Sequence, residues 1–283
     1  MDWQCVATLT ELFAVNCMAV SADGTILASA GNSLLSIWHL PSRQRLHSLV
    51  VCDGEVCNIA LTPNGKLLVS GSVSEATSQG VVKVWNTETG QELAAWIEET
   101  TDWISLAIHP NGKILAIGTD ESHSRPAIHL WDLDRLSFLK TLVEYNETIH
   151  SLAFSPDGQA IAAASGCDVF LCTLTGQEID RLQESTDSVE CVAFSPNGRQ
   201  LASSSTDKKI RLWNLSNVRD CYEIDIYGYP SSIAFSATGQ ILVANIYQDS
   251  LQLWDINSHS ALQLVVRQVA REGDEISREL VRD

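Results

Sequence analysis

The stretch AFSPNGRQLASSSTDKKIRLWNL, residues 193–215, holds two turn signals on either side of a short run of serine and apolar residues. Pro196, Asn197 and Gly198 suit successive positions of a tight turn, because proline presets φ, asparagine tolerates the next position and glycine adopts a positive φ. A second turn is expected at residues 206–208. We therefore predict three short antiparallel strands, a unit that needs copies of itself on either side to bury both faces.

The same pattern occurs six times along the chain. The steps between the turn glycines are 41, 47, 46, 40 and 41 residues, and these glycines are Gly24, Gly65, Gly112, Gly158, Gly198 and Gly239. The third strand carries a tryptophan in five copies, Trp38, Trp85, Trp131, Trp213 and Trp254, and Cys172 in the remaining copy. A fourth apolar stretch follows each set. A period of this length, with four short strands per copy, is typical of a β-propeller.

The first strand of each copy is apolar on both faces, which indicates a strand buried between neighbouring sheets. One face carries a small residue in register in every copy, namely Ala19, Ala60, Ala107, Ala153, Ala193 and Ala234. The predicted fold class is thus all-β, with residues 1–266 as a single propeller domain and residues 267–283 as a charged C-terminal tail.

The turn S-P-D-G or S-P-N-G, the second strand L-A-S-x-S and the third strand I-x-L-W-D/N resemble the WD40 repeat family, particularly its regular bacterial arrays. The resemblance covers nearly 90% of the chain. It implies a WD40-type β-propeller. It implies little about function, because propellers host many unrelated roles.

The six inner strand sets favour six four-stranded blades. In the family, an N-terminal outer strand completes the last blade, so the resemblance implies that residues 3–9 pair on the last sheet. Residues 261–266 would then be displaced or added outside it. The alternative is an incomplete seven-bladed propeller, whose open edges would invite a partner strand.

The resemblance also implies structural roles for the five motif tryptophans and for an aspartate of the second turn. That aspartate matches Asp207 and Asp249, and Asp168 is a further candidate. The family's Gly-His pair before the first strand is absent from every copy. Its histidine normally joins the tryptophan, a serine or threonine and that aspartate in a buried hydrogen-bond network. We expect an incomplete network here, with ordinary packing holding the blades together.

The formal net charge is −17, which argues against binding to a nucleic-acid backbone. It favours a basic protein or peptide partner, or serves solubility alone. Eight scattered cysteines without a C-x-x-C pair indicate reduced thiols in a cytoplasmic protein. Neither a membrane-spanning apolar run nor a signal peptide is expected.

A search for catalytic chemistry finds no constellation that outweighs a structural explanation. The seven histidines show no metal-ligand spacing, and no glycine-rich phosphate loop leads into a helix. Cys167 and Cys172 lie near Asp168 in sequence, but no histidine is fixed beside them, so structural thiols are the simpler interpretation. We predict no catalytic, cofactor or metal site, and hence no enzyme.

The loops before the first strands remain as candidate contact surfaces. Acidic residues gather there, namely Glu98, Glu99, Asp102, Glu144 and Asp187, together with the aromatic residues Phe13, Trp103, Tyr145, Tyr227 and Tyr229. Large aromatic side chains beside acidic ones are typical of an interaction hot spot. Trp103 also aligns with apolar first-strand positions such as Val56 and Val189, so core packing is its alternative role.

Three functional hypotheses follow. The first is a non-enzymatic scaffold that presents an acidic, aromatic-bearing rim to a protein or peptide. The second is a small-ligand or catalytic propeller with a site at the channel mouth, where the inner strands offer small uncharged residues such as Asn58 and Ser105. The third is a fragment of a larger regulatory protein whose other domains set its function.

Overall fold

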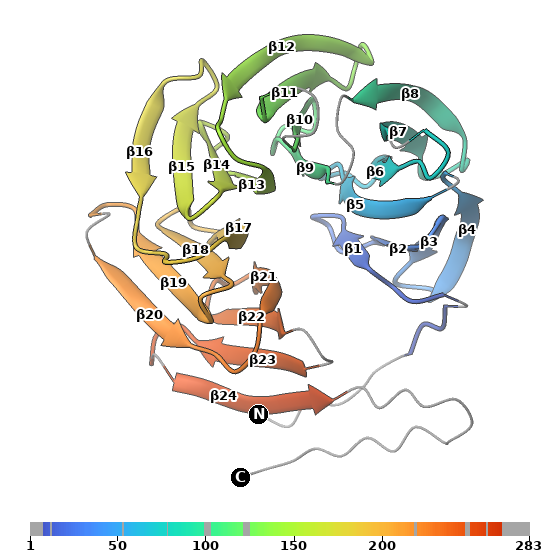
Figure 1. Cartoon of the computed structure of the whole chain (residues 1–283). Helices are drawn as coiled ribbons and strands as arrows, with labels where there is room; N and C mark the ends of the chain where they lie inside the picture. The colour runs from blue at the N-terminus through green and yellow to red at the C-terminus, as the bar shows by residue number, and fades with distance from the viewer. Residues whose placement is uncertain are drawn as a thin grey trace. The chain divides into compact units, whose positions relative to one another are not determined.

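The computed structural model of the chain describes residues 8–11, 13–52, 54–77, 79–98, 103–120, 125–217, 220–246, 250–258 and 260–267, and the side chains of 250 and 260–267 are not described. Within these ranges the chain forms 24 β-strands and no helix (Figure 1). The described part of the chain therefore contains no helix long and apolar enough to cross a membrane. The strands form six four-stranded antiparallel sheets, each connected in sequence order. These sheets are the six blades of a β-propeller, and the predicted fold class is confirmed.

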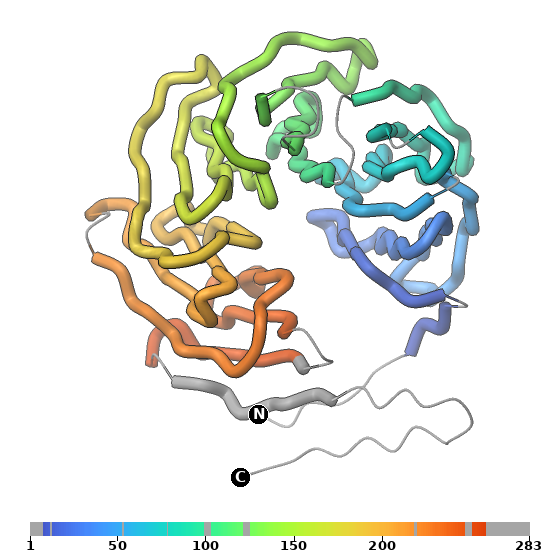
Figure 2. The backbone as a smooth tube through the Cα atoms, viewed as in Figure 1, coloured from blue at the N-terminus to red at the C-terminus, as the bar shows by residue number. Residues whose placement is uncertain are grey.

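The chain divides into two compact units, residues 1–149 and 150–283. Within each unit the backbone runs back and forth through one sheet before it enters the next (Figure 2). The first unit holds blades 1 to 3, whose strands are β1 (Cys17–Val20), β2 (Ile26–Gly31), β3 (Leu34–His39), β4 (Gln44–Val50), β5 (Glu55–Leu61), β6 (Leu67–Val73), β7 (Gly80–Asn86), β8 (Glu92–Glu98), β9 (Ser105–Ile108), β10 (Ile114–Gly118), β11 (Ala127–Asp132) and β12 (Ser137–Glu144).

The second unit holds blades 4 to 6, and the first of its strands begins at the boundary. Its strands are β13 (Ile149–Phe154), β14 (Ala160–Ser165), β15 (Asp168–Thr173), β16 (Glu178–Leu182), β17 (Val189–Phe194), β18 (Gln200–Ser205), β19 (Lys209–Asn214), β20 (Cys221–Asp225), β21 (Pro230–Phe235), β22 (Ile241–Ile246), β23 (Ser250–Asp255) and β24 (Ser260–Arg267).

The last blade is completed by its own repeat. β24 pairs antiparallel with β23, with Trp254 opposite Ala261 and Leu251 opposite Val266. The expectation that residues 261–266 would be displaced from this sheet is therefore wrong, because their strand already fills the fourth position. Residues 3–7, most of the segment expected to close the ring, lie outside the described residues, as does most of the tail.

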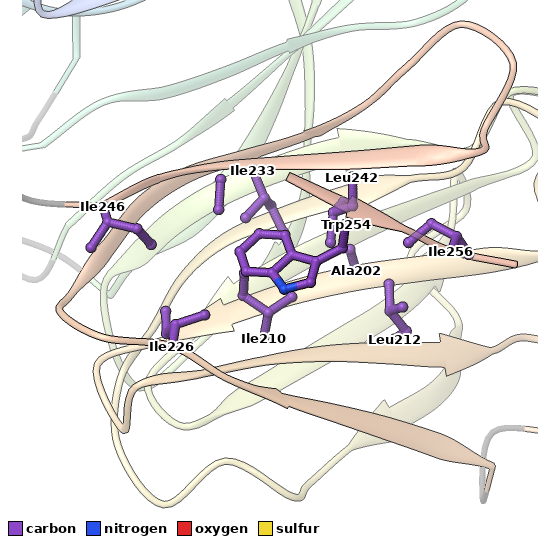
Figure 3. Close-up of a cluster of buried hydrophobic side chains, with 10 residues drawn as sticks. Ala202, Ile210, Leu212, Ile226, Ile233, Leu242, Ile246, Trp254 and Ile256 are labelled. Carbon is purple, nitrogen blue, oxygen red and sulfur yellow. The ribbon is translucent and has the colours of Figure 1, made fainter. Parts of the chain in front are cut away.

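Inner faces of neighbouring sheets pack together within each unit. In the second unit, one cluster joins blades 5 and 6, where Ile210 and Leu212 meet Leu242 and Trp254 (Figure 3). The matching cluster in the first unit joins blades 1 and 2. Each fully buried aliphatic side chain of this kind contributes about 1.5–3 kcal/mol relative to exposure. These isoleucine, leucine and tryptophan side chains are thus the contacts that hold adjacent blades within each unit.

The tight turns carry the hydrogen bonds expected of their sequence. In blade 1, the Ser21 hydroxyl donates to Asp23 Oδ1 at 2.6 Å and accepts from the Ile26 amide at 2.9 Å. Gly24 follows with φ of 70°. Hydrogen bonds from the Ser21 hydroxyl and the Thr25 amide hold the pKa of Asp23 below its usual value. The turn of blade 4 repeats this arrangement, since Ser155 lowers the pKa of Asp157.

These two aspartates should contribute to acid sensitivity. Because each pKa is depressed in the folded state, the stabilisation is complete above the unfolded-state value near 3.8 and is lost as the pH falls through the folded-state pKa. The double variant Asp23→Asn/Asp157→Asn should therefore lose less stability than the unchanged chain as the pH falls below about 4. Asparagine is compatible with the turn, since Asn197 occupies the same position in blade 5. Urea unfolding across this pH range measures the effect, and parallel curves for the two proteins would contradict it.

Candidate functional site

The most exposed aromatic side chains of the described chain lie in the loop between β20 and β21. We call residues 226–229 the tyrosine loop. Tyr227 is 93% exposed and Tyr229 is 53% exposed. Gly228 between them has φ of 114°, which an L-amino acid rarely adopts, and this fixes the bend that presents both rings. The tyrosine loop thus displays two large amphipathic rings at little conformational cost.

The tyrosine loop rests on the turn between β18 and β19 of the preceding blade. The Ile226 amide donates to the Lys208 carbonyl at 3.0 Å, and Lys208 Nζ lies 5.4 Å from the centre of the Tyr229 ring. Asp187, in the loop before β17, is exposed and its carbonyl accepts from the Ser205 hydroxyl at 3.0 Å. Three connecting segments of the second unit are therefore tied to one another by hydrogen bonds or ring contacts.

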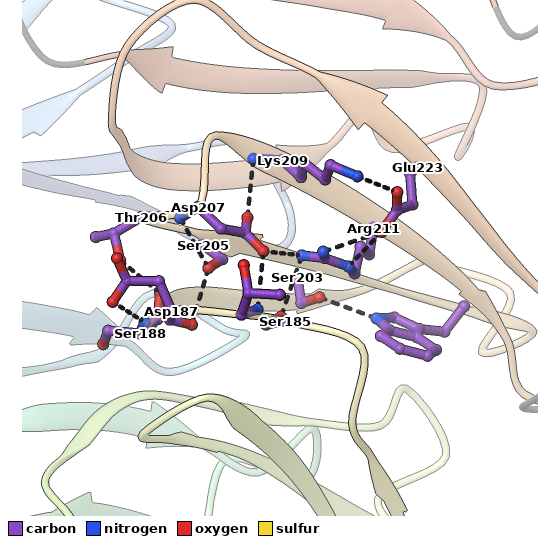
Figure 4. Close-up of polar contacts among 12 residues, drawn as sticks. Ser185, Asp187, Ser188, Ser203, Ser205, Thr206, Asp207, Lys209, Arg211 and Glu223 are labelled. Atoms are coloured by element: carbon purple, nitrogen blue, oxygen red, sulfur yellow. Dashed lines mark hydrogen bonds and ion pairs between the residues drawn. The ribbon is translucent and has the colours of Figure 1, made fainter.

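A buried arginine stabilises this end of blade 5 (Figure 4). The Arg211 side chain is 2% exposed, and its Nη1 atom lies 2.8 Å from Asp207 Oδ2. Its Nη2 atom lies 2.9 Å from Glu223 Oε1, and Nη1 donates to the Ser185 hydroxyl at 3.2 Å. Asp207 in turn accepts from the Thr186 amide at 3.1 Å. The network joins the loop before β17 to the turn after β18 and to β20.

Blade 1 has a buried carboxylate at the corresponding place. Glu11 accepts hydrogen bonds from the Trp38 indole at 3.0 Å, the Ser29 hydroxyl at 2.5 Å and the Ser36 hydroxyl at 3.0 Å. Its side chain is 7% exposed, and Arg45 Nη1 lies 3.5 Å from its carboxylate. Glu11 therefore ties the segment before β1 to the second and third strands of the blade.

A spacing rule connects these residues, and the sequence analysis missed it. Glu11 and Ser185 each lie ten residues before the turn serine of their blade, Ser21 and Ser195. Tyr145 lies ten residues before Ser155 and is 7% exposed. The constant distance to the turn is the signal that could have identified this inward-facing position.

Several predicted contact residues are therefore not at the surface. Tyr145 is buried at the spacing just described, and its amide donates to the Pro126 carbonyl at 2.6 Å. Glu98 is 4% exposed at the end of β8, where its Oε2 atom lies 2.9 Å from His129 Nδ1. Phe13 is half-buried, whereas Glu144 is exposed at the end of β12. Glu99, Asp102 and Asp249 lie outside the described residues.

Trp103 lies at the surface of the first unit. It is 37% exposed, and the neighbouring Ile104 is fully buried in the core between blades 2 and 3. The Trp103 amide donates to Asp120 Oδ2 at 3.1 Å, so a buried carboxylate fixes the backbone here. The core-packing interpretation of Trp103 is wrong, because Ile104 fills the apolar position.

The motif tryptophans differ in their indole partners. Trp85 donates to the Ser70 hydroxyl and Trp213 to the Ser203 hydroxyl, both at 2.9 Å. Trp38 donates to Glu11 and also reaches Ser29 at 3.2 Å. In blade 3 the equivalent second-strand residue is Ile117, and among the described residues the Trp131 indole nitrogen has no hydrogen-bond partner. The expected network is thus incomplete, but parts of it survive in blades 1, 2 and 5.

Asp168 takes another role from that of Asp207. It accepts from Arg181 Nε at 3.0 Å, across β15 and β16, and the Arg181 guanidinium lies 4.6 Å from the Phe170 ring centre. Arg181 is 45% exposed, so this is a surface pair on the outer side of blade 4.

Comparison with protein families agrees with these repeats. The family model described as "WD domain, G-beta repeat" matches residues 3–39, 43–86, 136–171 and 176–214, which together make up more than half of the chain. The chain belongs to the WD40 repeat family. The matched ranges contain β1–β3, β5–β7 and β17–β19. WD40 propellers generally act as protein-interaction scaffolds rather than as enzymes.

A curated relative matches a smaller part of this WD40 chain. The Periodic tryptophan protein 2 homolog of Neurospora crassa is 40% identical over 67 residues, which is 23% of this chain. The match covers 8% of the relative's length. It supports the repeat assignment for that segment.

The cysteines of this WD40 chain are suited to packing. Burial raises the pKa of Cys17 to about 12, with further contributions from Cys57 and Glu55. Burial likewise raises the pKa of Cys57 and of Cys221 to about 11. These thiols are protonated at neutral pH and are poor nucleophiles. In the part of the chain that the structure describes, no three His, Cys, Asp or Glu side chains form a cluster able to hold a metal ion.

Proposed function

We propose that this protein is a WD40 interaction scaffold whose contact surface includes the tyrosine loop. The observation that carries the proposal is the exposure of two tyrosines, 93% for Tyr227 and 53% for Tyr229, on a loop braced by the blade beneath it. Tyrosine is enriched at binding hot spots because it combines a large apolar area with a polar tip. Its function would be assembly or regulation of a protein complex.

The charge of the chain supports a basic partner. The formal net charge is −17, and Asp187 and Asp225 are exposed in segments adjoining the tyrosine loop. Lys208 at 5.4 Å from the Tyr229 ring centre indicates that this ring accepts a cation on its face. A lysine or arginine of a partner would meet both an aromatic face and a negative field. Trp103 and Glu144 in the first unit are further candidate contacts in this proposal. The proposal also includes a cytoplasmic location, which is consistent with the free cysteines.

Alanine substitution in the tyrosine loop tests the proposal. The double variant Tyr227→Ala/Tyr229→Ala should weaken partner binding by about 30-fold or more, since one hot-spot residue accounts for 2 kcal/mol or more. Both rings are exposed, so the unfolding curve should change little. Binding is measured by capture of partners on the immobilised protein, followed by titration with the purified partner.

A matched control distinguishes binding by the tyrosine loop from nonspecific binding to any exposed aromatic side chain. Tyr222 in β20 is 41% exposed and belongs to the same unit, but it lies on the outer strand. Tyr222→Ala should leave partner binding unchanged. If both alanine proteins bind their partners like the unchanged chain, the tyrosine loop is not the contact surface. Equal losses in both would indicate a nonspecific apolar contact.

A further inference from the structure

Blade 2 ends in an outer strand of unusual composition. β8 (Glu92–Glu98) pairs with β7 on one side, and the strand order β5-β6-β7-β8 places it at the edge of its sheet. Its five central residues, LAAWI, are uncharged. Leu93 is 41% exposed, Ile97 is 63% exposed, and Ala95 between them is exposed as well. An apolar stripe thus follows an edge along which no further strand pairs in the part of the chain that the structure describes.

Four other outer strands, β4, β12, β16 and β20, carry charged residues that protect them against pairing. Among the five outer strands whose side chains the structure describes, β8 alone carries no charged residue between its two ends. The protecting residues elsewhere are Arg45 in β4, Lys140 in β12, Asp180 and Arg181 in β16, and Glu223 in β20. Charged side chains within an edge strand prevent strand addition, because pairing would desolvate them. Their absence from β8 leaves the edge of blade 2 open to an additional strand.

Acidic residues lie beside one end of the apolar stripe. Glu88 is exposed in the turn before β8, and the Glu92 side chain, which pairs with Lys83 at 2.9 Å, is 40% exposed at its start. At the other end, Glu98 is buried and pairs with His129. A strand lying along β8 would therefore gain from apolar residues in its centre and from a basic residue beside Glu88 and Glu92.

We propose that the edge of β8 binds an extended peptide segment of a partner protein by strand addition, with alternating apolar residues and a basic residue at the end that lies beside Glu88 and Glu92. Main-chain hydrogen bonds would supply affinity, and Leu93, Ala95 and Ile97 would contact every second side chain of the peptide. Trp96 faces the other way, since its ring centre lies 4.5 Å from that of Trp131 in blade 3. That contact anchors β8 to its neighbour, so the edge is held in an extended form before binding. This surface is separate from the tyrosine loop.

The test uses the whole chain and the fluorescein-labelled peptide Lys-Val-Thr-Val-Thr-Val-Lys, with anisotropy as the readout at physiological salt. Ala95→Glu is the decisive variant. Ala95 is exposed, and Lys83, which pairs with Glu92 at 2.9 Å, lies directly opposite it in the sheet, so the new carboxylate would stand in solvent beside a lysine and the blade should remain folded. We expect affinity for the peptide to fall at least tenfold. If the basic peptide bound by electrostatic attraction alone, the added negative charge of Ala95→Glu would instead increase its affinity, and that result would overturn the proposal.

Controls address the strand geometry and the surface. Leu46→Glu adds the same charge to β4, where Leu46 is 41% exposed, and should leave peptide affinity unchanged. A peptide of the same sequence with N-methylated backbone amides should not bind, because it lacks main-chain donors. Tyr227→Ala/Tyr229→Ala should bind the peptide normally, which separates this proposal from the one above.

Failure of the unchanged chain to bind at millimolar peptide overturns the proposal. The proposal is also overturned if sedimentation shows that the unchanged chain self-associates and that Ala95→Glu dissociates this complex.

Discussion

Replacing Arg211 with alanine should lower the free energy of unfolding by about 3–5 kcal/mol. Arg211 is 2% exposed, and it neutralises Asp207, whose side chain is 6% exposed. Its removal would leave a buried carboxylate that accepts hydrogen bonds from the Thr186 and Lys209 amides but has no counter-ion. An unpaired buried charge costs more than the ion pair itself contributes, so truncation of one partner is the severe change. Urea unfolding, followed by circular dichroism, measures the loss.

Arg181 provides the matched control for this prediction. It also pairs with an aspartate across two strands of the second unit, but it is 45% exposed. Water and salt screen such a pair, so Arg181→Ala should cost about 1 kcal/mol or less. Arg211→Lys should fall between the two, since an ammonium keeps the charge but cannot form the planar fork that reaches Asp207 and Glu223 together. Equal losses for Arg211→Ala and Arg181→Ala would show that burial of the network contributes little to stability.

The repeat chemistry explains why the fold could be predicted from sequence. Each turn serine or threonine accepts from an amide five residues later, as Ser195 does from Gln200 and Ser21 from Ile26. These interactions are local, and they recur in blades 1, 2, 4, 5 and 6, whereas His109 takes the position in blade 3. The tryptophan of the third strand is equally regular, since Cys172 replaces it in one blade. Local rules that recur in five of six blades leave little ambiguity about the strands.

The surface could not be predicted in the same way, because it depends on register. In blades 2 and 5 the first strand begins with a register shift, and the residue before it, Val56 or Val189, turns into the core. β9 pairs regularly from Ser105, so Ile104 becomes the buried residue and Trp103 lies outside. A shift of one residue exchanges inward and outward side chains. An alignment of repeats assumes a constant register, and for this reason it offers core packing as an alternative role for Trp103, which is 37% exposed.

The polar networks escaped prediction for a different reason. They replace the family's histidine with residues of other chemistry at the same distance from the turn, a carboxylate in Glu11 and a hydroxyl in Ser185. Each substitute relies on a distant partner, Trp38 in one blade and Arg211 in the other. The absence of the family's histidine therefore predicted an incomplete hydrogen-bond network, whereas other donors and acceptors form hydrogen bonds at that position.

Glu11→Ala should have the second-largest effect, a loss of about 2–4 kcal/mol, because hydrogen bonds to a charged group contribute about 1.5–3 kcal/mol each and are partly redundant here. The Trp38 indole would keep Ser29 as an acceptor at 3.2 Å, but the Ser36 hydroxyl would lose the carboxylate that it reaches at 3.0 Å. Arg45 would lose its counter-ion, although its 39% exposure makes that loss small. Thermal and urea unfolding measure the change.

Glu11→Gln separates the hydrogen bonds from the charge. Glutamine keeps one acceptor oxygen for Trp38 and Ser29 but gives up the second carboxylate oxygen, which serves Ser36. We expect it to recover at least half of the loss caused by alanine, since the network needs acceptors more than it needs a net charge. If glutamine is as destabilising as alanine, the negative charge itself holds the segment before β1, and Arg45 contributes more than its exposure suggests. If neither variant loses stability, Glu11 does not anchor that segment, and the packing of β1 against blade 2 is sufficient to fix blade 1.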